Sequence, residues 1–356
     1  MAPIFTGNKF GFGQGPVGDP PDPITATGGD ATSEPGDGYK YHYWTTSPAP
    51  TNFVVSAGNA PVEWIVIGGG GGGGVDRFNP VRYGGGGGAG GLRTNFPGIE
   101  TKDGTSIVEA ATGKVAPGTY PVDIGEGGTG GLNSDNSVAG LNGSTSTLGL
   151  PSDYGGPIVC QGGGGGGGHN SPTNGPIPQA AEPGGSGGGG YASPASPLSP
   201  TEFGLGNYVA GGDTPVPTQG HPGGTSNGSP QWQGGGGGGA GQKGFAGNEP
   251  NPESPLYSPT VGAKGEGGQG VPFGPAGIPP SYGTPGPAPG RWFAGGGGAS
   301  PLQSVGGFGG GGGHPGSDPA PGVDATANTG SGGGAGKEAG AGNGADGIVI
   351  VRYSLT

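Results

Sequence analysis

Apolar residues are concentrated in a few short segments separated by long Gly- and Pro-rich stretches. β-Branched and aromatic residues fill 39–44, 51–57 and 62–67 early in the chain, and 347–353 at its end. Turn-forming residues flank these segments, which is typical of strands. We therefore predict β-strands at these positions. Weaker strand candidates are 105–108, 119–124 and 158–160.

The two most apolar strands, 64–67 and 348–351, bracket nearly all of the glycine-rich sequence. We infer that they pair in one sheet, which would hold together the two ends of everything between them. No helix of ordinary length fits, because the longest segments without Gly or Pro, Tyr39–Ser47 and Ile348–Thr356, are shorter than a typical helix of about 11–12 residues. Interior Gly and Pro also cost roughly 1 and 3 kcal/mol each relative to Ala.

Glycine occurs in blocks between these strands, and Pro-rich connections join the blocks. The blocks are 68–74, 84–91, 125–131, 162–168, 184–190, 204–212, 234–241, 262–270, 295–313 and 330–344. The connections include 170–183, 192–203, 248–260, 271–294 and 314–329. This alternation predicts an irregular repeat of a straight segment followed by a loop.

Three backbone conformations compete for these blocks. Gly contributes 101 and Pro 41 of the 356 residues, and such a composition without a fixed period is typical of disorder. Collagen is excluded, because a triple helix needs Gly at every third position and 192–203 contains none. The blocked arrangement favours polyglycine II helices, which have no internal hydrogen bonds, so that neighbours packed side by side satisfy one another's amides. In this conformation Gly68–Gly74 would span ~22 Å.

We therefore predict a mostly β or irregular fold with essentially no α-helix. A small β-sheet unit is expected at 39–67, with a return strand at 347–353. A bundle of polyglycine II helices, joined by Pro-rich loops, is expected over 68–346.

Residues 1–38 are predicted to be an N-terminal attachment segment. Phe5, Phe10 and Phe12 lie in a flexible Gly-rich stretch, where they suit docking into a partner protein. A floppy terminus is the alternative. The N-terminus lacks a basic segment followed by an apolar stretch, so we expect no secretory signal peptide.

Charge and composition exclude several classes of partner. The net charge is −12, with 12 Lys and Arg against 24 Asp and Glu, which disfavours binding to nucleic acid. No apolar run is long enough for a transmembrane helix, so we expect no membrane insertion. Cys160 is the single cysteine, which excludes an intrachain disulfide.

Motifs for catalysis, cofactors and metals are weak, and we expect none of these activities. GxGxxG patterns arise by chance at this glycine content, and a dinucleotide site needs a following helix. The histidines show no metal-ligand spacing and are expected to be exposed in loops; they are His42, His169, His221 and His314. Ser186 matches the Gly-x-Ser-x-Gly pattern, but only within Gly-rich sequence.

Aromatic residues are the more informative candidates, since many lie in or beside the connections. One interpretation is that they cover the flanks of the glycine bundle. The other is that rigid aromatic loops contact a receptor, where Tyr and Trp dominate binding energy. The connection 271–294 is the preferred loop, because its prolines would limit the entropy lost on binding. The candidate receptor-binding residues are Phe273, Tyr282, Arg291, Trp292, Tyr257 and Trp232, with Arg291 suited to an anionic sugar.

Four segments in order resemble a glycine-rich domain of bacteriophage tail-fibre proteins, many of them from marine viruses of cyanobacteria. They are Gly84–Arg93 (GGGGGAGGLR), Gly118–Gly128 (GTYPVDIGEGG), Thr326–Gly336 (TANTGSGGGAG) and Gly347–Tyr353 (GIVIVRY). The resemblance covers about 50–356. A more distant similarity links it to tip adhesins of long tail fibres, which present polyglycine II helices with recognition loops.

This resemblance implies a virion surface protein, made in the host cytoplasm, that recognises a host-cell receptor. The expected partners are other virion or fibre proteins through the N-terminal segment, a host surface glycan or outer-membrane protein, and further copies of the chain, for example in a trimer. A purely structural fibre or capsid decoration protein stays open as an alternative. An ice-binding protein is a third class, although Thr is not periodic here.

Overall fold

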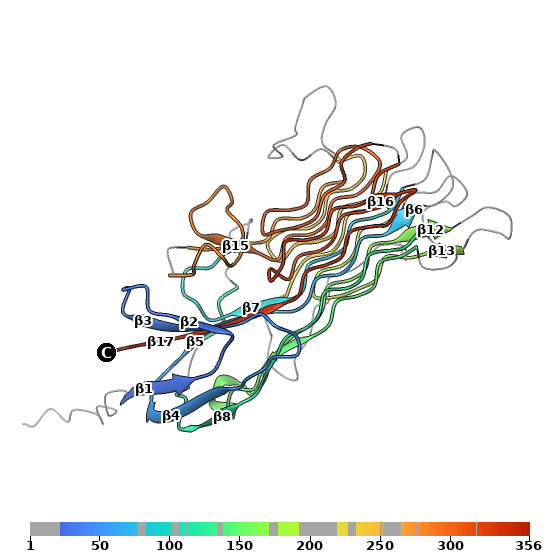
Figure 1. Cartoon of the computed structure of the whole chain (residues 1–356). Coiled ribbons are helices and arrows are strands. Elements are labelled where there is room, and N and C mark those ends of the chain that lie inside the picture. The colour runs from blue at the N-terminus through green and yellow to red at the C-terminus, as the bar shows by residue number, and fades with distance from the viewer. Residues whose placement is uncertain are drawn as a thin grey trace, which may run out of the picture.

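The computed structural model describes residues 22–76, 83–101, 107–110, 113–133, 138–170, 177–191, 219–226, 233–249, 251, 265–274, 277–317 and 319–356. The larger β-sheets gather at one end of an elongated molecule, and long segments running side by side fill the rest (Figure 1). Within the described residues there is no α-helix, and a 3₁₀ turn occurs at Ser152–Tyr154. The predicted mostly β or irregular fold is thus confirmed.

A five-stranded sheet, the main sheet, joins the two ends of the sequence. Its order is β2 (Ala31–Ser33), β3 (Tyr39–Trp44), β17 (Ile348–Ser354), β5 (Glu63–Ile67) and β7 (Leu92–Thr94). β17 lies antiparallel to β5, with Ile350 opposite Ile65. The predicted pairing of 64–67 with 348–351 is therefore confirmed.

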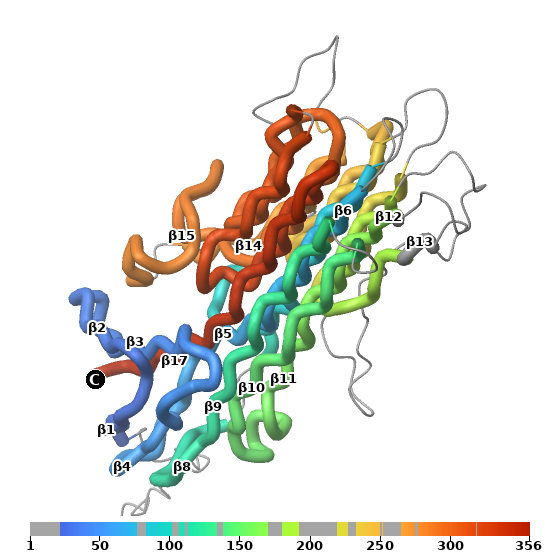
Figure 2. Tube along the Cα trace, turned by 45° about the vertical axis from the view of Figure 1, so that its right-hand side comes forward, coloured from blue at the N-terminus to red at the C-terminus, as the bar shows by residue number. Residues whose placement is uncertain are grey.

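Smaller sheets surround the main sheet or lie at the far end of the molecule. They are β1 (Asp22–Thr27), β4 (Phe53–Asn59) and β8 (Gly118–Tyr120); β9 (Val122–Asp123), β10 (Ser146–Leu148) and β11 (Ile158–Cys160); β14 (Val271–Phe273) and β15 (Arg291–Phe293); and β6 (Val75–Asp76), β12 (Gly168–Asn170), β13 (Ile177–Gln179) and β16 (Gly336–Lys337). All but the last of these sheets pack against the main sheet or lie beside it at the same end (Figures 1 and 2).

Alternating side chains of the main sheet enter two separate hydrophobic cores. On β5, Trp64 and Val66 face one core, whereas Ile65 and Ile67 face the other. The first core lies under β1, β4 and the β9–β11 sheet, and the second lies under the β14–β15 hairpin. Burial on both faces explains why these strands are continuously apolar.

The β unit begins earlier than the sequence indicated. Residues 22–38 were assigned to the attachment segment, but β1 pairs with β4, and β2 pairs with β3. Ile24 and Ala26 alternate with exposed neighbours and are buried in the first core. Phe5, Phe10 and Phe12 lie outside the described residues, so their attachment role stays a prediction.

The strands of the main sheet continue directly into glycine segments. β5 leads into 68–74, 84–91 leads into β7, and 340–347 leads into β17. Figure 2 shows these segments leaving the sheets side by side as extended tubes. We call each such segment a rod.

Hydrogen bonds rotate around the rod 68–75 with a period of three residues. The amide of Gly71 donates to Gly88 O at 2.8 Å, that of Gly72 to Leu141 O at 2.9 Å, and that of Gly73 to Gly342 O at 2.9 Å. Gly74 then returns to the first neighbour and donates to Gly85 O. A β-strand would alternate between two directions, so this threefold rotation identifies polyglycine II.

The carbonyl groups of the same rod complete a hexagonal arrangement. Gly69, Gly70 and Gly71 accept from Gly163, Gly128 and Gly333, each in a different neighbour. Six rods therefore surround 68–75, three as acceptors and three as donors. They are 84–91, 138–144, 340–347, 125–131, 161–168 and 330–336. The predicted rod bundle is present, and a buried glycine backbone finds all its partners in it.

Neighbouring backbones come so close that a β-carbon has no room. A Cβ atom added at Gly71 would lie 2.2 Å from Gly164 O, and one at Gly72 would lie 2.2 Å from Thr129 O. The Cα hydrogen in that direction instead points at the carbonyl oxygen, which adds a weak Cα–H···O contact. Inner rods must consequently be nearly pure glycine.

Rods at the edge of the bundle need less glycine because part of their circumference faces outward. In 125–131, Glu126 and Thr129 are exposed three residues apart, while Gly128 and Gly130 are buried. The rod 138–144 likewise exposes Leu141. A three-residue spacing of larger side chains therefore marks an edge rod.

We expect Gly72→Ala to lower the free energy of unfolding by about 3 kcal/mol, because the added methyl group overpacks the backbone contact with Thr129 O. Chemical denaturation of the two proteins measures the change. Gly340→Ala is the matched control, since its Cβ would meet only Gly131 O, at 3.8 Å. Equal losses in the two variants would contradict the close packing of the inner rods.

His42 of β3 is a buried titratable group in the first core. Its ring lies 5.5 Å from Phe53 and 5.7 Å from Tyr353, and Nδ1 lies 2.7 Å from Gly28 O. The carbonyl can only accept, so Nδ1 carries the proton. Burial lowers the pKa of His42 below its usual 6.5, because the charged form loses solvation.

Acid should therefore destabilise the fold through His42. The unfolded state binds a proton more readily, so the contribution of His42 is present above pH 6.5 and is lost as the pH falls toward the lower folded-state pKa. We expect the Tm of His42→Gln to fall less over this window than that of the natural chain. Parallel Tm profiles for the two proteins would contradict this role.

Candidate functional site

The two ends of the rod bundle differ in what they carry. The main sheet, β1 and the C-terminal Thr356 lie at one end, which we call the sheet end (Figure 1). Rod segments turn back at the opposite, distal end, as shown by described residues that flank each connection. These connections are 77–82, 134–137, 171–176, 227–232, 250–264, 301–303, 315–319 and 337–339.

A small β-sheet joins the distal ends of three rods. β6, β12 and β16 follow the rods 68–74, 162–168 and 330–336, with β6 in the middle. Its register aligns His169, Asp76 and Lys337 across the strands. We call these three residues the distal charged row.

The distal charged row is buried, and aromatic rings flank it. Asp76 is 1% exposed, His169 1% and Lys337 3%. The Lys337 Nζ lies 5.1 Å from the centre of the Tyr83 ring, and the rings of His169 and Tyr191 are 5.7 Å apart. The parallel pairing of β6 with β12 and β16 fixes the positions from which the distal connections depart.

The structure corrects the prediction for the histidines. They were expected to be exposed in loops, but His42, His169 and His314 are buried, and His221 is half-buried. Ser186 is buried within a rod, where its carbonyl accepts from the Gly164 amide. The backbone of Ser186 is thus part of the hydrogen-bonded rod bundle and not of a strand–helix turn.

The connection 271–294 lies at the sheet end, not at the distal end. Phe273 is 0% exposed, because the β14–β15 hairpin covers the second core, and Trp292 is 5% exposed, because it packs against Phe308 and donates from Nε1 to Ala288 O. These two side chains therefore pack inside the protein and present little surface to a receptor. The apolar face of β3, which needs a cover, is the physical reason for this placement.

Tyr282 and Arg291 are half-exposed but make internal contacts. The Tyr282 ring stacks on Tyr43 with a centroid distance of 4.5 Å. Arg291 donates from Nε to Tyr282 O and from Nη2 to Pro280 O, each at 2.7 Å. The guanidinium of Arg291 therefore stabilises the loop to which Arg291 belongs. Receptor contact by Tyr282 and Arg291 stays a prediction, and Trp232 and Tyr257 lie outside the described residues.

Side chains cap the rod bundle at one edge, where the described residues form no further rod. Asp346 Oδ1 accepts from the Gly127 amide at 2.8 Å, and Asn343 Oδ1 accepts from the Gly130 amide at 2.9 Å. On another rod, Asn142 Oδ1 accepts from Gly165 at 2.8 Å. Each oxygen stands in for the carbonyl of a missing neighbour. The three-residue spacing of Asn343 and Asp346 is the sequence signal for these caps.

Other kinds of site find no support in the described part of the chain. There, no three His, Cys, Asp or Glu side chains lie together in a way that could hold a metal ion. A helix with the length and hydrophobicity to cross a membrane is likewise absent from the described residues.

Comparison with known proteins gives a family for most of the chain. The family model described as a glycine-rich domain matches residues 45–354. It spans the β unit from the end of β3 together with the whole rod bundle. No curated protein matches the chain significantly.

We expect Asn343→Ala to lower the free energy of unfolding by about 1 kcal/mol, because the Gly130 amide loses its acceptor. Hydrogen exchange of the Gly130 amide should accelerate at the same time. Thr129→Ala is the control, since this side chain is exposed in the same rod. Unchanged exchange at Gly130 in Asn343→Ala would show that the side chain is not a cap.

Proposed function

The chain belongs to the glycine-rich domain family, and from this premise we propose that it is an adhesin on a virus particle, in a tail fibre or at its tip. The proposal combines the resemblance to tail-fibre proteins with one structural observation. The sheet end holds β1 and the C-terminus, whereas the connections named above, from 77–82 to 337–339, join rods at the opposite end. Attachment to the particle and recognition of a host surface would then use opposite ends of a stiff body.

The rod bundle suits the role of a stiff spacer. Its hydrogen bonds link segments far apart in sequence, for example Gly70 with Ala345 and Gly87 with Gly333. Loops held on such a scaffold can vary without loss of the fold, as is usual where recognition is carried by loops.

The distal connections have a composition that suits recognition. The segment 252–264 joins two rods at the distal end, whereas 192–218 begins after Tyr191 at the distal end and is followed by Gln219, which bonds to Leu92 of β7 at the sheet end. Both segments combine Pro and Ser with aromatic residues, namely Phe203, Tyr208 and Tyr257. Aromatic side chains supply large contact areas, and prolines limit the entropy lost on binding. We propose that these connections bind a host surface glycan or outer-membrane protein.

The other proposed partners follow from the same difference between the sheet end and the distal end. The residues before Asp22 precede β1, which lies at the sheet end, and would engage another virion or fibre protein through Phe5, Phe10 and Phe12. Association into a homo-oligomer such as a trimer would place several sets of distal loops side by side and raise the avidity for a cell surface.

Binding of the labelled full chain to intact cells of a panel of cyanobacterial strains tests this proposal. Replacing 252–264 by a Gly/Ser segment of equal length should weaken binding to susceptible strains by roughly tenfold or more, with unchanged Tm, because a recognition surface is removed. The matched control replaces exposed Pro285, Pro287 and Pro289 at the sheet end by Ser, and should leave binding within about twofold.

Two outcomes would contradict the proposal. Loss of binding in the sheet-end control alone would assign recognition to 271–294 instead of the distal connections. Absence of binding to every strain would favour the structural fibre or decoration role, and thermal hysteresis of the same protein would identify the ice-binding class.

A further inference from the structure

A pocket of about 200 Å³ lies on the flank of the rod bundle, between two neighbouring rods. One rod is 265–270 and the other is 304–308. The Gly267 amide donates to Val305 O at 3.1 Å, and the Gly270 amide donates to Phe308 O at 2.7 Å. The floor of the pocket is therefore fixed by lattice hydrogen bonds.

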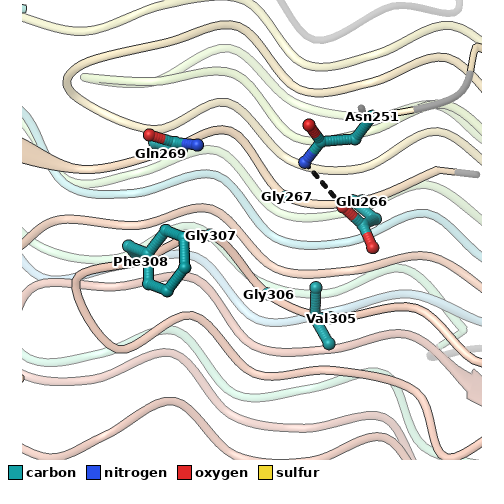
Figure 3. Close-up of a pocket in the computed structure, with 8 residues that line it drawn as sticks. All are labelled: Asn251, Glu266, Gly267, Gln269, Val305, Gly306, Gly307 and Phe308. Atoms are coloured by element: carbon teal, nitrogen blue, oxygen red, sulfur yellow. Dashed lines mark hydrogen bonds between the residues drawn. The ribbon is translucent and has the colours of Figure 1, made fainter. Parts of the chain in front are cut away.

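The period of three brings a polar and an apolar row to this pocket. Both rods have two large side chains separated by two glycines, as Glu266-Gly-Gly-Gln269 and Val305-Gly-Gly-Phe308. Residues three apart lie on the same side of a threefold helix. Figure 3 shows Glu266 and Gln269 along one side and Val305 and Phe308 along the other.

The polar groups lie deep and the apolar groups lie near the opening. Glu266 is 0% and Gln269 2% exposed, whereas Val305 and Phe308 are half-exposed. The Asn251 Nδ2 donates to Glu266 Oε2 at 2.6 Å, which orients the carboxylate. The Trp292 ring packs against Phe308 at 5.8 Å and supports its position.

We propose that this pocket binds a single neutral sugar ring. A carboxylate and two primary amides offer both acceptors and donors to vicinal hydroxyl groups, and the phenyl ring of Phe308 covers the C–H face of the sugar. Few polar groups converging in a concave site with an apolar wall are typical of small-molecule sites. The volume is suited to one pyranose ring rather than an oligosaccharide. Asn251 belongs to the distal connection 250–264, whereas the other seven lining residues lie on the two rods. The proposal does not rest on the adhesin role.

Saturation-transfer-difference NMR on the full chain tests the site with D-glucose, D-galactose, D-mannose and N-acetyl-D-glucosamine as probes. At least one sugar should receive saturation at its ring protons. Glu266→Gln, which removes the charge, and Phe308→Leu, which keeps an apolar side chain without the ring, should each weaken binding by roughly tenfold. Glu126→Gln is the matched control, because Glu126-Gly-Gly-Thr129 repeats the spacing on another edge.

The proposal is overturned if no sugar receives saturation from the natural chain, or if both variants bind as the natural chain does. Since Phe308→Leu retains apolar volume, its Tm separates loss of the site from loss of the fold. Replacement of 252–264 changes none of the eight lining residues, so retained sugar binding with lost cell binding distinguishes this site from the adhesin surface.

Discussion

The structure depends on the backbone hydrogen bonds that neighbouring rods make with one another. These rods pack together with no side chains between them. Each successive amide of 68–75 points to a different neighbour, and the direction repeats after three residues. One rod gains little, because ordering a residue costs roughly 1–2 kcal/mol and a net hydrogen bond returns about 0.5–1.5 kcal/mol. Only a rod surrounded on every side can pair all of its amides and carbonyls with other rods. Glycine is required there because a neighbouring oxygen lies where a β-carbon would be.

Conventional hydrophobic cores give this lattice its register. β5, β7 and β17 are fixed by side chains on both faces of the main sheet, and each continues into a rod. The rods therefore start from defined positions rather than finding one another along a featureless glycine backbone. At the distal end, β6, β12 and β16 align the ends of three rods through the distal charged row. The resulting body is stiff along its axis and differs at its two ends, which is the basis for the proposed adhesin.

Much of the architecture could be predicted because its signals are local. Apolar strands such as 64–67 and 348–351 and pure glycine blocks such as 68–74 stand out in one sequence. Edge rods such as 138–144 and 320–325 were not predicted, because a rod that faces outward needs few glycines. The blocks 295–313 and 330–344 also contain turns, so that each supplies more than one rod.

The candidate sites were harder to predict, because they depend on which side of a rod is covered. The aromatic residues Phe273 and Trp292 are typical of a binding loop, yet Phe273 is buried in the second core and Trp292 packs against Phe308. Conversely, the spacing of Asn343 and Asp346 gives an edge cap only once the adjacent rod is known. The alignment of Asp76 with His169 and Lys337 arises from rods distant in sequence. Periods of three in polar residues are therefore the signal to seek in such sequences.

Long-range HNCO spectroscopy, which detects couplings across hydrogen bonds, tests the rod lattice most directly. The account predicts that the amides of Gly71, Gly72 and Gly73 correlate with the carbonyl carbons of Gly88, Leu141 and Gly342, respectively. Correlations that alternate between two partner segments would identify a β-ladder, and the absence of any correlation would identify a coil. Either result would contradict the polyglycine II arrangement.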